Sequence, residues 1–281
     1  MSSEIFLAVL GAALLHASWN ALVKFGSDRF VAISLMAIFS GVISLIGILF
    51  VGFLSLSALP WLLLSVAFHT GYCLFLSKAY EQAEFGQIYP IARGVAPLLS
   101  ALLSWLILSE IPRTIALLGT LVLVSGVIMM TFDGRHGPNK LNVRAIIYAL
   151  ITATFTACYT LSDGAGSRAS IEPLSYILWL FMFNGLTMFT LLWIMHRNVV
   201  FREIRQHWRH GIIGGAMQLL AYGIVIWAMK STPIALVAAL RETSVLFAMV
   251  ISVWMLKEKP SMLRVIASAV IMAGVVITKF G

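Results

Sequence analysis

Two stretches of similar pattern decide the fold: LLSWLILSEIP at residues 102–112 and VISVWMLKEKP at residues 250–260. Each ends an apolar run with Glu-x-Pro and is followed by another apolar run that contains Gly-Val. A shift of 148 residues, which is 250 minus 102, superposes them and extends the match on both sides. Because charged residues, Pro and Gly rarely align by chance in an apolar sequence, we infer an internal repeat. The matched pairs include Arg93 with Arg241, Ser104 with Ser252, Glu110 with Glu258, Pro112 with Pro260 and Gly126 with Gly274.

A weaker match extends the repeat toward the start of the chain. At a shift of 140 residues (157 minus 17), Ala17, Trp19, Gly26 and Ser27 align with Ala157, Tyr159, Gly166 and Ser167. We therefore predict two five-helix repeats, at residues 1–132 and 143–281, joined by a linker at residues 133–142.

The composition is that of a protein that crosses the membrane many times. Hydrophobic residues make up 60% of the 281 residues and charged residues only 11%, against about 25% charged residues in soluble domains. Continuous apolar runs of roughly 20 residues fit transmembrane helices and exclude the alternating strands of a β-barrel. The prediction is an all-α polytopic membrane protein with ten transmembrane helices, at about residues 4–25, 30–54, 60–80, 86–108, 112–131, 143–163, 173–195, 210–229, 232–256 and 261–279.

The odd number of helices in each repeat determines how the repeats are related. After five crossings, the second repeat must enter the membrane from the opposite side, so the repeats are inverted about an axis in the membrane plane. Two similar halves of opposite orientation can exchange conformations, which gives states open to either side comparable energies. This architecture favours a carrier that works by alternating access.

The residues between the predicted helices indicate orientation and surroundings. Thirteen Lys and Arg residues fall on one face and four on the other, so the first face is predicted to be cytoplasmic and both termini to lie outside. The net charge of +8 indicates anionic lipid rather than nucleic acid as its counterpart. The first apolar stretch is predicted to be a retained helix, not a signal peptide. Cys73 and Cys158 lie within apolar runs, so we expect them to act as small hydrophobic residues.

Two arginines are predicted to lie inside the membrane, at equivalent positions of the repeats. A guanidinium in a bilayer costs about 2.5–3.5 kcal/mol on insertion scales, so Arg93 and Arg241 are expected to face a polar cavity. One interpretation is that they bind a carboxylate, phosphate or phosphonate group of a solute. The other is a structural ion pair, such as Arg241 with Asp163. The lack of an acidic neighbour favours the first interpretation for Arg93, whereas Glu242 beside Arg241 leaves both open.

Glu242 is the carboxylate that the sequence places most clearly within a helix. When desolvated it could take up a proton and couple transport to a proton gradient, or it could bind a solute amine. Alternatively, Glu242 lies at a helix bend and only balances the charge of Arg241.

Other polar and aromatic residues recur three or four positions apart, which places them on one face of a helix. We predict that they line a wet central cavity, and that all of them except Asp163 contact the substrate. For each residue the alternative is packing, and for Asn20 it is an interhelical hydrogen bond. The groups are His16, Trp19 and Asn20; His69 and Tyr72; Tyr89 and Arg93; Tyr159 and Asp163; and Gln218 and Tyr222.

Prolines and glutamates mark predicted turning points of the chain. Pro90 and Pro97 interrupt the fourth predicted helix, where a kink could gate the cavity. Pro233 is expected simply to start the ninth helix. Glu110 and Glu258 each precede a proline by two residues, and their carboxylates are expected near the N-terminus of the helix that follows.

The segment HASWNALVK at residues 16–24, with the two repeated stretches above, resembles the drug/metabolite transporter superfamily and, within it, the ten-helix EamA-type carriers. The likeness covers essentially the whole chain. QIYPIARGVAPLL at residues 87–99 is similar to a branch associated with phosphonate utilisation. The resemblance implies metabolite transport: many relatives export amino acids, and others exchange phosphorylated solutes.

The sequence therefore predicts a secondary transporter of a small anionic or zwitterionic metabolite in the inner membrane. It would be a monomer or homodimer, with the solute and the lipid bilayer as partners and with no cofactor, metal or nucleic acid. The alternatives are a multidrug or cation exporter, a channel, and an intramembrane enzyme acting on a lipid-linked substrate. The sequence contains no paired catalytic carboxylates, H-E-x-x-H run or P-loop, which argues against an enzyme and against ATP-driven pumping.

Overall fold

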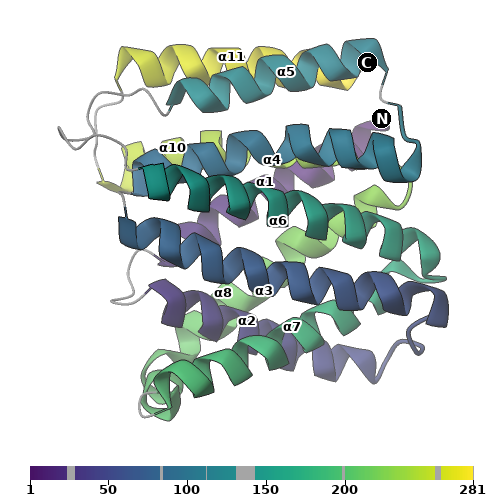
Figure 1. The fold of residues 1–281 in the computed structure, drawn as a ribbon, viewed down its shortest axis with the longest axis vertical. Helices are drawn as coiled ribbons and strands as arrows, with labels where there is room; N and C mark the ends of the chain where they lie inside the picture. Colours follow the sequence, from purple (N-terminus) through teal and green to yellow (C-terminus); the bar gives the residue numbers. More distant parts are fainter. Residues whose placement is uncertain are drawn as a thin grey trace.

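The computed structural model describes residues 1–23, 29–82, 85–111, 113–130, 143–197, 200–256 and 261–280, and these residues form a helical bundle (Figure 1). The first repeat contains α1 (Ser3–Val23), α2 (Arg29–Ile48), a 3₁₀ turn η1 (Leu56–Ala58), α3 (Leu59–Gln82), α4 (Phe85–Leu108) and α5 (Thr114–Met129). The second contains α6 (Val143–Ala169), α7 (Pro173–His196), α8 (Val200–Met229), α9 (Ile234–Arg241), α10 (Ser244–Leu256) and α11 (Met262–Phe280).

The helices have the lengths and the surface of membrane spans. Within the described ranges, nine helical stretches are long and apolar enough to cross a bilayer, and α9 and α10 together make one of them. The tenth span is α5, a shorter apolar helix of 16 residues. Large apolar side chains such as Leu106 and Ile194 are exposed on the outside, where lipid would solvate them. The predicted all-α, ten-helix membrane fold is confirmed.

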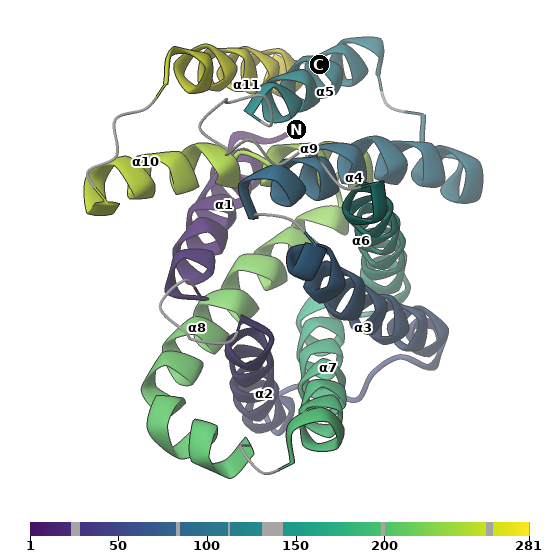
Figure 2. The same cartoon turned by 60° about the vertical axis from the view of Figure 1, so that its left-hand side comes forward.

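The two repeats pack as an inverted pair. Helices α1, α2, α3, α4 and α5 correspond to α6, α7, α8, the α9–α10 pair and α11. Two helices pack against their own counterparts, α2 on α7 and α5 on α11. Contacts between unlike helices occur twice: α3 lies on α6 as α8 lies on α1, and α4 lies on α6 as α9 and α10 lie on α1 (Figures 1 and 2). A pseudo-two-fold axis between the repeats produces this reciprocity.

Two of the predicted boundaries were wrong. The stretch from 196 to 210 was expected to be a connection, but α8 begins at Val200 and only departs from helical geometry at His207 (φ −118°, ψ 15°). Val200 and Ile204 pack against Leu192 of α7, so tertiary contacts hold a helix whose charged residues suggested a loop. The helix expected over 232–256 is broken between Arg241 and Ser244.

The crossing of α2 and α7 depends on two glycines that face each other. A methyl group added to Gly185 would lie 2.8 Å from both the Cα of Gly41 and the carbonyl oxygen of Ala37. Such distances are shorter than van der Waals contact, so the two backbones approach too closely for any side chain. Small residues at helix crossings are typical of membrane proteins, where close packing rather than hydrophobicity drives association.

Gly185→Val is therefore expected to destabilise the bundle. Overpacking costs about 1–3 kcal/mol, and here backbone atoms rather than a flexible side chain would have to move. Thermal unfolding in detergent measures the effect. Gly11→Val is the matched control, since Gly11 also lies in a helix but has nothing within 4 Å of an added methyl group. Equal melting temperatures for the two variants would show that the α2–α7 crossing tolerates separation.

Polar side chains join the two repeats at the end of the bundle where both termini lie (Figure 1). Glu110, just after α4, forms an ion pair with Arg168 near the end of α6. The Oε2 atom of Glu110 also accepts a hydrogen bond from the backbone N–H of Ile234, the first residue of α9, at 3.1 Å. The carboxylate was expected at the following helix, α5, but it stabilises the N-terminus of α9 in the other repeat. Its repeat counterpart, Glu258, lies outside the described residues.

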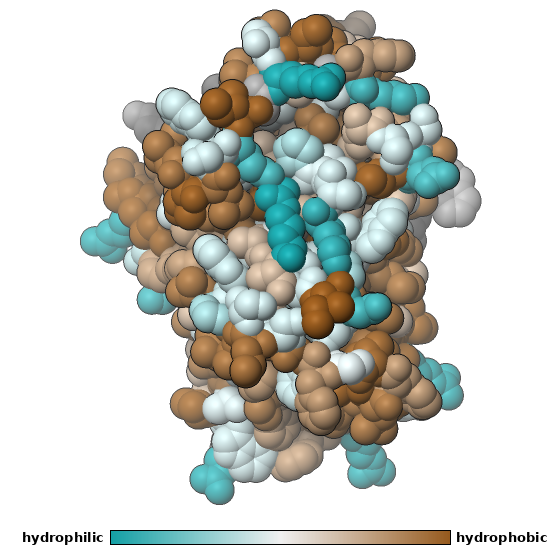
Figure 3. Space-filling model, turned by 90° about the vertical axis from the view of Figure 1, so that its right-hand side faces the viewer, coloured by the Kyte–Doolittle hydropathy of each residue, from teal (hydrophilic) through white to brown (hydrophobic). Residues whose placement is uncertain are grey.

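Two basic side chains complete the same end of the bundle. Arg168 donates from Nε to the carbonyl oxygen of Met229 (2.9 Å) and from Nη2 to that of Thr232 (3.1 Å), where α8 has ended. Lys230 donates to the carbonyl oxygen of Ile171, before α7, at 2.7 Å. Figure 3 looks onto this end and shows hydrophilic side chains in the middle with hydrophobic surface around them. We call Glu110, Arg168 and Lys230 the end cluster.

Candidate functional site

The break between α9 and α10 places four polar residues inside the membrane. Glu242 and Thr243 form a turn in which the backbone N–H groups of both residues bond to carbonyls three residues earlier, at 3.0 Å each. All four residues from Arg241 to Ser244 are buried, with exposed fractions of 3% or less. Glu242 keeps right-handed helical torsion angles, so the chain tightens here to 3₁₀-type bonds, and such a stretch within a helix often marks a functional position. The break therefore marks a candidate site.

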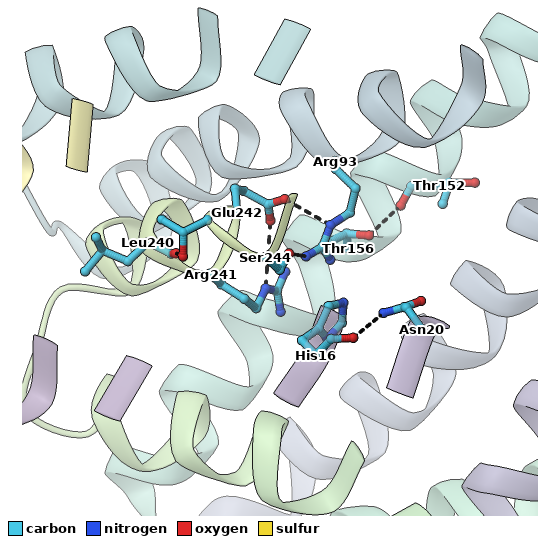
Figure 4. A network of polar contacts seen from close by, with 10 residues as sticks. His16, Asn20, Arg93, Thr152, Thr156, Leu240, Arg241, Glu242 and Ser244 are labelled. Atoms are coloured by element: carbon cyan, nitrogen blue, oxygen red, sulfur yellow. Dashed lines mark hydrogen bonds and ion pairs between the residues drawn. The ribbon is translucent and has the colours of Figure 1, made fainter. Parts of the chain in front are cut away.

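One carboxylate at this break is shared by arginines of both repeats. The Nε atom of Arg93, in α4, lies 2.9 Å from Oε2 of Glu242, and Nη2 of Arg93 donates to the Ser244 hydroxyl at 3.3 Å. The Nε atom of Arg241 lies 3.9 Å from the other carboxylate oxygen (Figure 4). The repeat-related arginines thus meet at a single anion, and the three ionised side chains carry one net positive charge.

The two arginines are held differently. Nε of Arg93 lies 2.9 Å from Glu242 and its Nη2 atom donates to Ser244, whereas Nε of Arg241 lies 3.9 Å from Glu242, beyond hydrogen-bond distance. The Arg241 guanidinium instead lies over the rings of Tyr222 (5.6 Å) and Tyr159 (6.0 Å). Cation–π contacts leave its donors available. Arg241 is therefore better placed than Arg93 to bind an anion, the reverse of the preference that sequence neighbours suggested.

Both guanidinium groups lie on the wall of a cavity of about 440 Å³. Ten of the twelve residues predicted to contact substrate line it: His16, Trp19, Asn20, His69, Tyr72, Arg93, Tyr159, Gln218, Tyr222 and Arg241. Glu242 lies behind the arginines and does not line the cavity, and the side chain of Tyr89 is outside the described part of the structure. Apolar neighbours that the sequence did not single out complete the wall, among them Ile33, Leu76, Phe181 and Met188.

Pro90 and Pro97, the predicted gating prolines, do not interrupt their helix. Helix α4 is continuous from Phe85 to Leu108 through Pro90 and Pro97. Pro97 is buried, and the side chain of Pro90 is not described. The break in the helix occurs instead in the counterpart of α4, at Arg241, where no proline is present. A gating role for Pro90 and Pro97 stays a prediction.

Aromatic rings form the wall beside Arg241. His69 stacks on Tyr159, with ring centroids 4.0 Å apart and planes at 22°, and Tyr222 meets His69 edge-on at 5.7 Å. Tyr72 approaches Tyr159 edge-on at 5.7 Å. Four residues from three helices thus lock one another into place, so the surface presented to the cavity is rigid and amphipathic.

Three other lining residues hold buried polar atoms with no partner among the residues described. They are the Oδ1 atom of Asn184 in α7, the Oε1 atom of Gln218 in α8 and the Nε1–H donor of Trp19 in α1. Buried polar groups are normally paired, so such atoms at a cavity are candidate contacts for a solute or water. Asn20, by contrast, donates to the carbonyl oxygen of His16 within its own helix at 2.8 Å.

Sequence reasoning missed Asn184, and the ion pair that it gave as an example, Arg241 with Asp163, is not the pair observed. Asn184 lies in an apolar helix, and its neighbours three positions away, Phe181 and Thr187, were not singled out. The carboxylate that pairs with Arg241 is Glu242, while Asp163 accepts hydrogen bonds from the hydroxyls of Tyr222 (2.6 Å) and Tyr176 (3.1 Å).

Comparison with known proteins agrees with this architecture. The model of the EamA-like transporter family matches residues 3–132 and 143–280, one match for each repeat. No curated protein is similar enough to count as a match. A solved structure titled "Crystal structure of protein" superposes with a TM-score of 0.80 at 18% identity, covering 100% of this chain and 98% of the other, which is a likeness of fold alone. The family match spans nearly the whole chain, and the protein is therefore a membrane transporter of the EamA-like transporter family.

Proposed function

We propose that this transporter is a secondary carrier of a small anionic or zwitterionic metabolite, such as an amino acid or an organophosphonate, across the inner membrane. The observation that carries the proposal is the Arg93–Glu242–Arg241 group. Its excess positive charge is buried beside a cavity, where water screens it poorly. A carboxylate or phosphonate group of a solute would neutralise this charge and accept two hydrogen bonds from the Arg241 guanidinium in bidentate geometry.

The uncharged part of the lining supports a zwitterion. The amide oxygens of Asn184 and Gln218 are acceptors, and an ammonium group has three donors and no acceptor. A solute with a carboxylate toward Arg241 and an ammonium group toward these oxygens would satisfy both parts of the cavity. The aromatic rings would then contact its apolar portion.

A thermal-shift screen of the purified protein tests the proposal directly, because a solute that binds only the folded state raises the melting temperature. Amino acids, phosphonates and phosphorylated metabolites are expected to raise it. The aromatic wall suggests a second candidate function, export of lipophilic cations, since cations bind over aromatic faces. Stabilisation by lipophilic cations alone would favour that function and contradict anion transport.

Alternating access is the mechanism that the inverted repeats favour. The cavity-lining residues of α1, α2 and α3 come from the halves of these helices that approach Val23, Arg29 and Gln82, the ends remote from the end cluster. The cavity thus extends away from the end cluster, whose bonds join the two repeats. In this proposal the end cluster holds the far side shut and must open for the solute to leave or enter there.

Arg168→Gln is expected to expose the cavity to the side where the termini lie. Cys73 lines the cavity, and with Cys158→Ser it is the sole cysteine, so it reports access. If the Arg168 contacts are worth roughly 1 kcal/mol, reaction of Cys73 with a charged thiol reagent added on the terminal side should quicken about 5-fold. Arg202→Gln, at a side chain that is 62% exposed, is the control. Equal reaction rates in the two variants would show that the end cluster does not control access to the cavity from this side.

A further inference from the structure

A second buried carboxylate lies beside the cavity, apart from the arginines. Asp163, in α6, has no exposed surface and accepts hydrogen bonds from Tyr222 of α8 at 2.6 Å and from Tyr176 of α7 at 3.1 Å. The hydroxyl of Ser65, in α3, is near enough to interact with this carboxylate. Four helices thus converge on an acidic group that contacts no solute in the function proposed above. Ionisable groups within membrane spans are costly and commonly mark ion or proton pathways.

Ser65 connects this carboxylate to the cavity. The Nδ1 atom of His69 lies 3.0 Å from the carbonyl oxygen of Ser65 and 3.1 Å from its hydroxyl oxygen. A carbonyl can only accept, so the hydrogen-bond network assigns the proton of neutral His69 to Nδ1. The Ser65 hydroxyl is then free to donate to Asp163. The other ring nitrogen of His69, Nε2, remains an acceptor on a ring that lines the cavity.

We propose that Asp163 is a proton-binding site of this carrier, loaded from the cavity through His69 and Ser65. A proton from cavity water binds Nε2 of His69. The Nδ1 proton then passes to the Ser65 oxygen while the Ser65 hydroxyl proton passes to Asp163. The products are a neutral Asp163, an intact Ser65 and a neutral His69 protonated on Nε2. Release follows the same steps in reverse, to whichever side the cavity then faces.

Proton binding at this site would favour anion binding at Arg241. Tyr222 links the two sites, because its hydroxyl bonds to Asp163 and its ring lies under the Arg241 guanidinium. Neutralising Asp163 removes a negative charge from the neighbourhood of Arg241 and weakens the charge-assisted bond that holds Tyr222. Coupling between sites is reciprocal, so a bound anion would also favour the proton, and both would cross in the same direction. This last step rests on the proposed function, but the proton site does not.

Several helices bring titratable groups toward Asp163, so a titration must be assigned by substitution. Arg241 acts on it from α9, and Arg93 of α4, which packs on α6, is paired with Glu242. The remaining groups are His69 from α3, Tyr176 from α7, Tyr222 from α8 and Tyr159 from α6 itself.

Infrared difference spectroscopy of the full chain in lipid vesicles, without any solute, tests the proposal. As the pH is lowered from about 9 to about 4, a range that covers ordinary and strongly perturbed carboxyl groups, the C=O stretch of a protonated carboxyl should appear. Exposed carboxyls such as Glu172 add a background band that is the same in every variant, so the variants are compared by difference from the wild-type chain. Asp163→Asn should remove one component of the band, whereas Glu242→Gln, a matched removal of the other buried carboxylate, should keep that component. A difference spectrum that shows no component lost in Asp163→Asn, or one lost only in Glu242→Gln, would overturn the assignment.

Two further variants keep the test decisive if Asp163→Asn does not fold. Tyr222→Phe keeps the ring but removes one donor to the carboxylate, so the pH at which the band appears must change. His69→Gln should leave the band in place but slow its response to a pH jump by about 100-fold, the usual scale of a lost proton-transfer group. An unchanged midpoint in the first variant overturns the site, and an unchanged rate in the second overturns the path. Because no solute is used, failure here leaves the Arg241 site standing, and a failed solute screen leaves the proton site standing.

Discussion

Replacing Arg241 by Gln is expected to weaken binding of an anionic solute by at least about 30-fold, equivalent to ~2 kcal/mol. Arg241 lines the cavity, and its 3.9 Å contact with Glu242 is longer and weaker than the 2.9 Å contact of Arg93, so a solute anion would compete with a loosely held partner. Arg241→Lys should restore part of the affinity, because Lys keeps the charge but loses the planar pair of donors. Isothermal titration with the strongest stabiliser from the thermal-shift screen measures both variants.

The control for this prediction is Arg202→Gln, the same change at an exposed side chain outside the cavity. It should leave the affinity unchanged. Wild-type affinity in Arg241→Gln would show that the anionic group of the solute binds elsewhere. Affinity for lipophilic cations should not fall in Arg241→Gln, because this variant removes a positive charge and uncovers the faces of Tyr159 and Tyr222.

Glu242→Ala is expected to destabilise the fold by about 3–5 kcal/mol, the scale on which removing one partner leaves buried charges unpaired. Glu242 is fully buried, and its two oxygens face Arg93 and Arg241 from opposite repeats. Without the carboxylate, two guanidinium groups would face each other inside the membrane. The melting temperature in detergent, compared with that of the wild-type chain, measures the loss.

A small anion should reverse the effect of Glu242→Ala, which separates lost charge from lost packing. Acetate can occupy the volume that the side chain leaves and should raise the melting temperature of this variant more than that of the wild-type chain. Glu172→Ala, at an exposed glutamate before α7, is the control and should behave as wild type. Stability equal to wild type in Glu242→Ala would falsify the view that this carboxylate holds the two arginines.

Much of the fold was predictable because the patterns that determine it can be read along the sequence without knowing which helices touch. Hydropathy gives the number of spans, and the alignment of Arg93 with Arg241 and of Glu110 with Glu258 gives the repeat. The break at Glu242 was not predictable in this way. Residues 232–256 read as one apolar helix, and the residue at the interruption, Glu242, pairs with Arg93 of the other repeat, which no local pattern indicates. The same limit applies to Glu110, whose partners Arg168 and Ile234 lie far along the chain.

The cavity residues also divide into those that a local sequence pattern indicates and those that depend on contacts between distant helices. Pairs such as His69 with Tyr72 and Gln218 with Tyr222 were found because helical periodicity alone places them on one face, and both pairs line the cavity. Asn184 was missed although Phe181, three positions earlier, lines the cavity with it. Asp163 was recognised as a polar residue of its helix, but its partners come from α7 and α8, and the sequence does not say which helices touch.

The ion pair between Arg93 and Glu242 also constrains the order of events during synthesis. Arg93 is made 149 residues (242 minus 93) before the carboxylate that neutralises it. At about 5–20 residues per second, the newly inserted α4 waits on the order of ten seconds for the Glu242 carboxylate. The final packing of the first repeat therefore includes a contact that only the second repeat can supply.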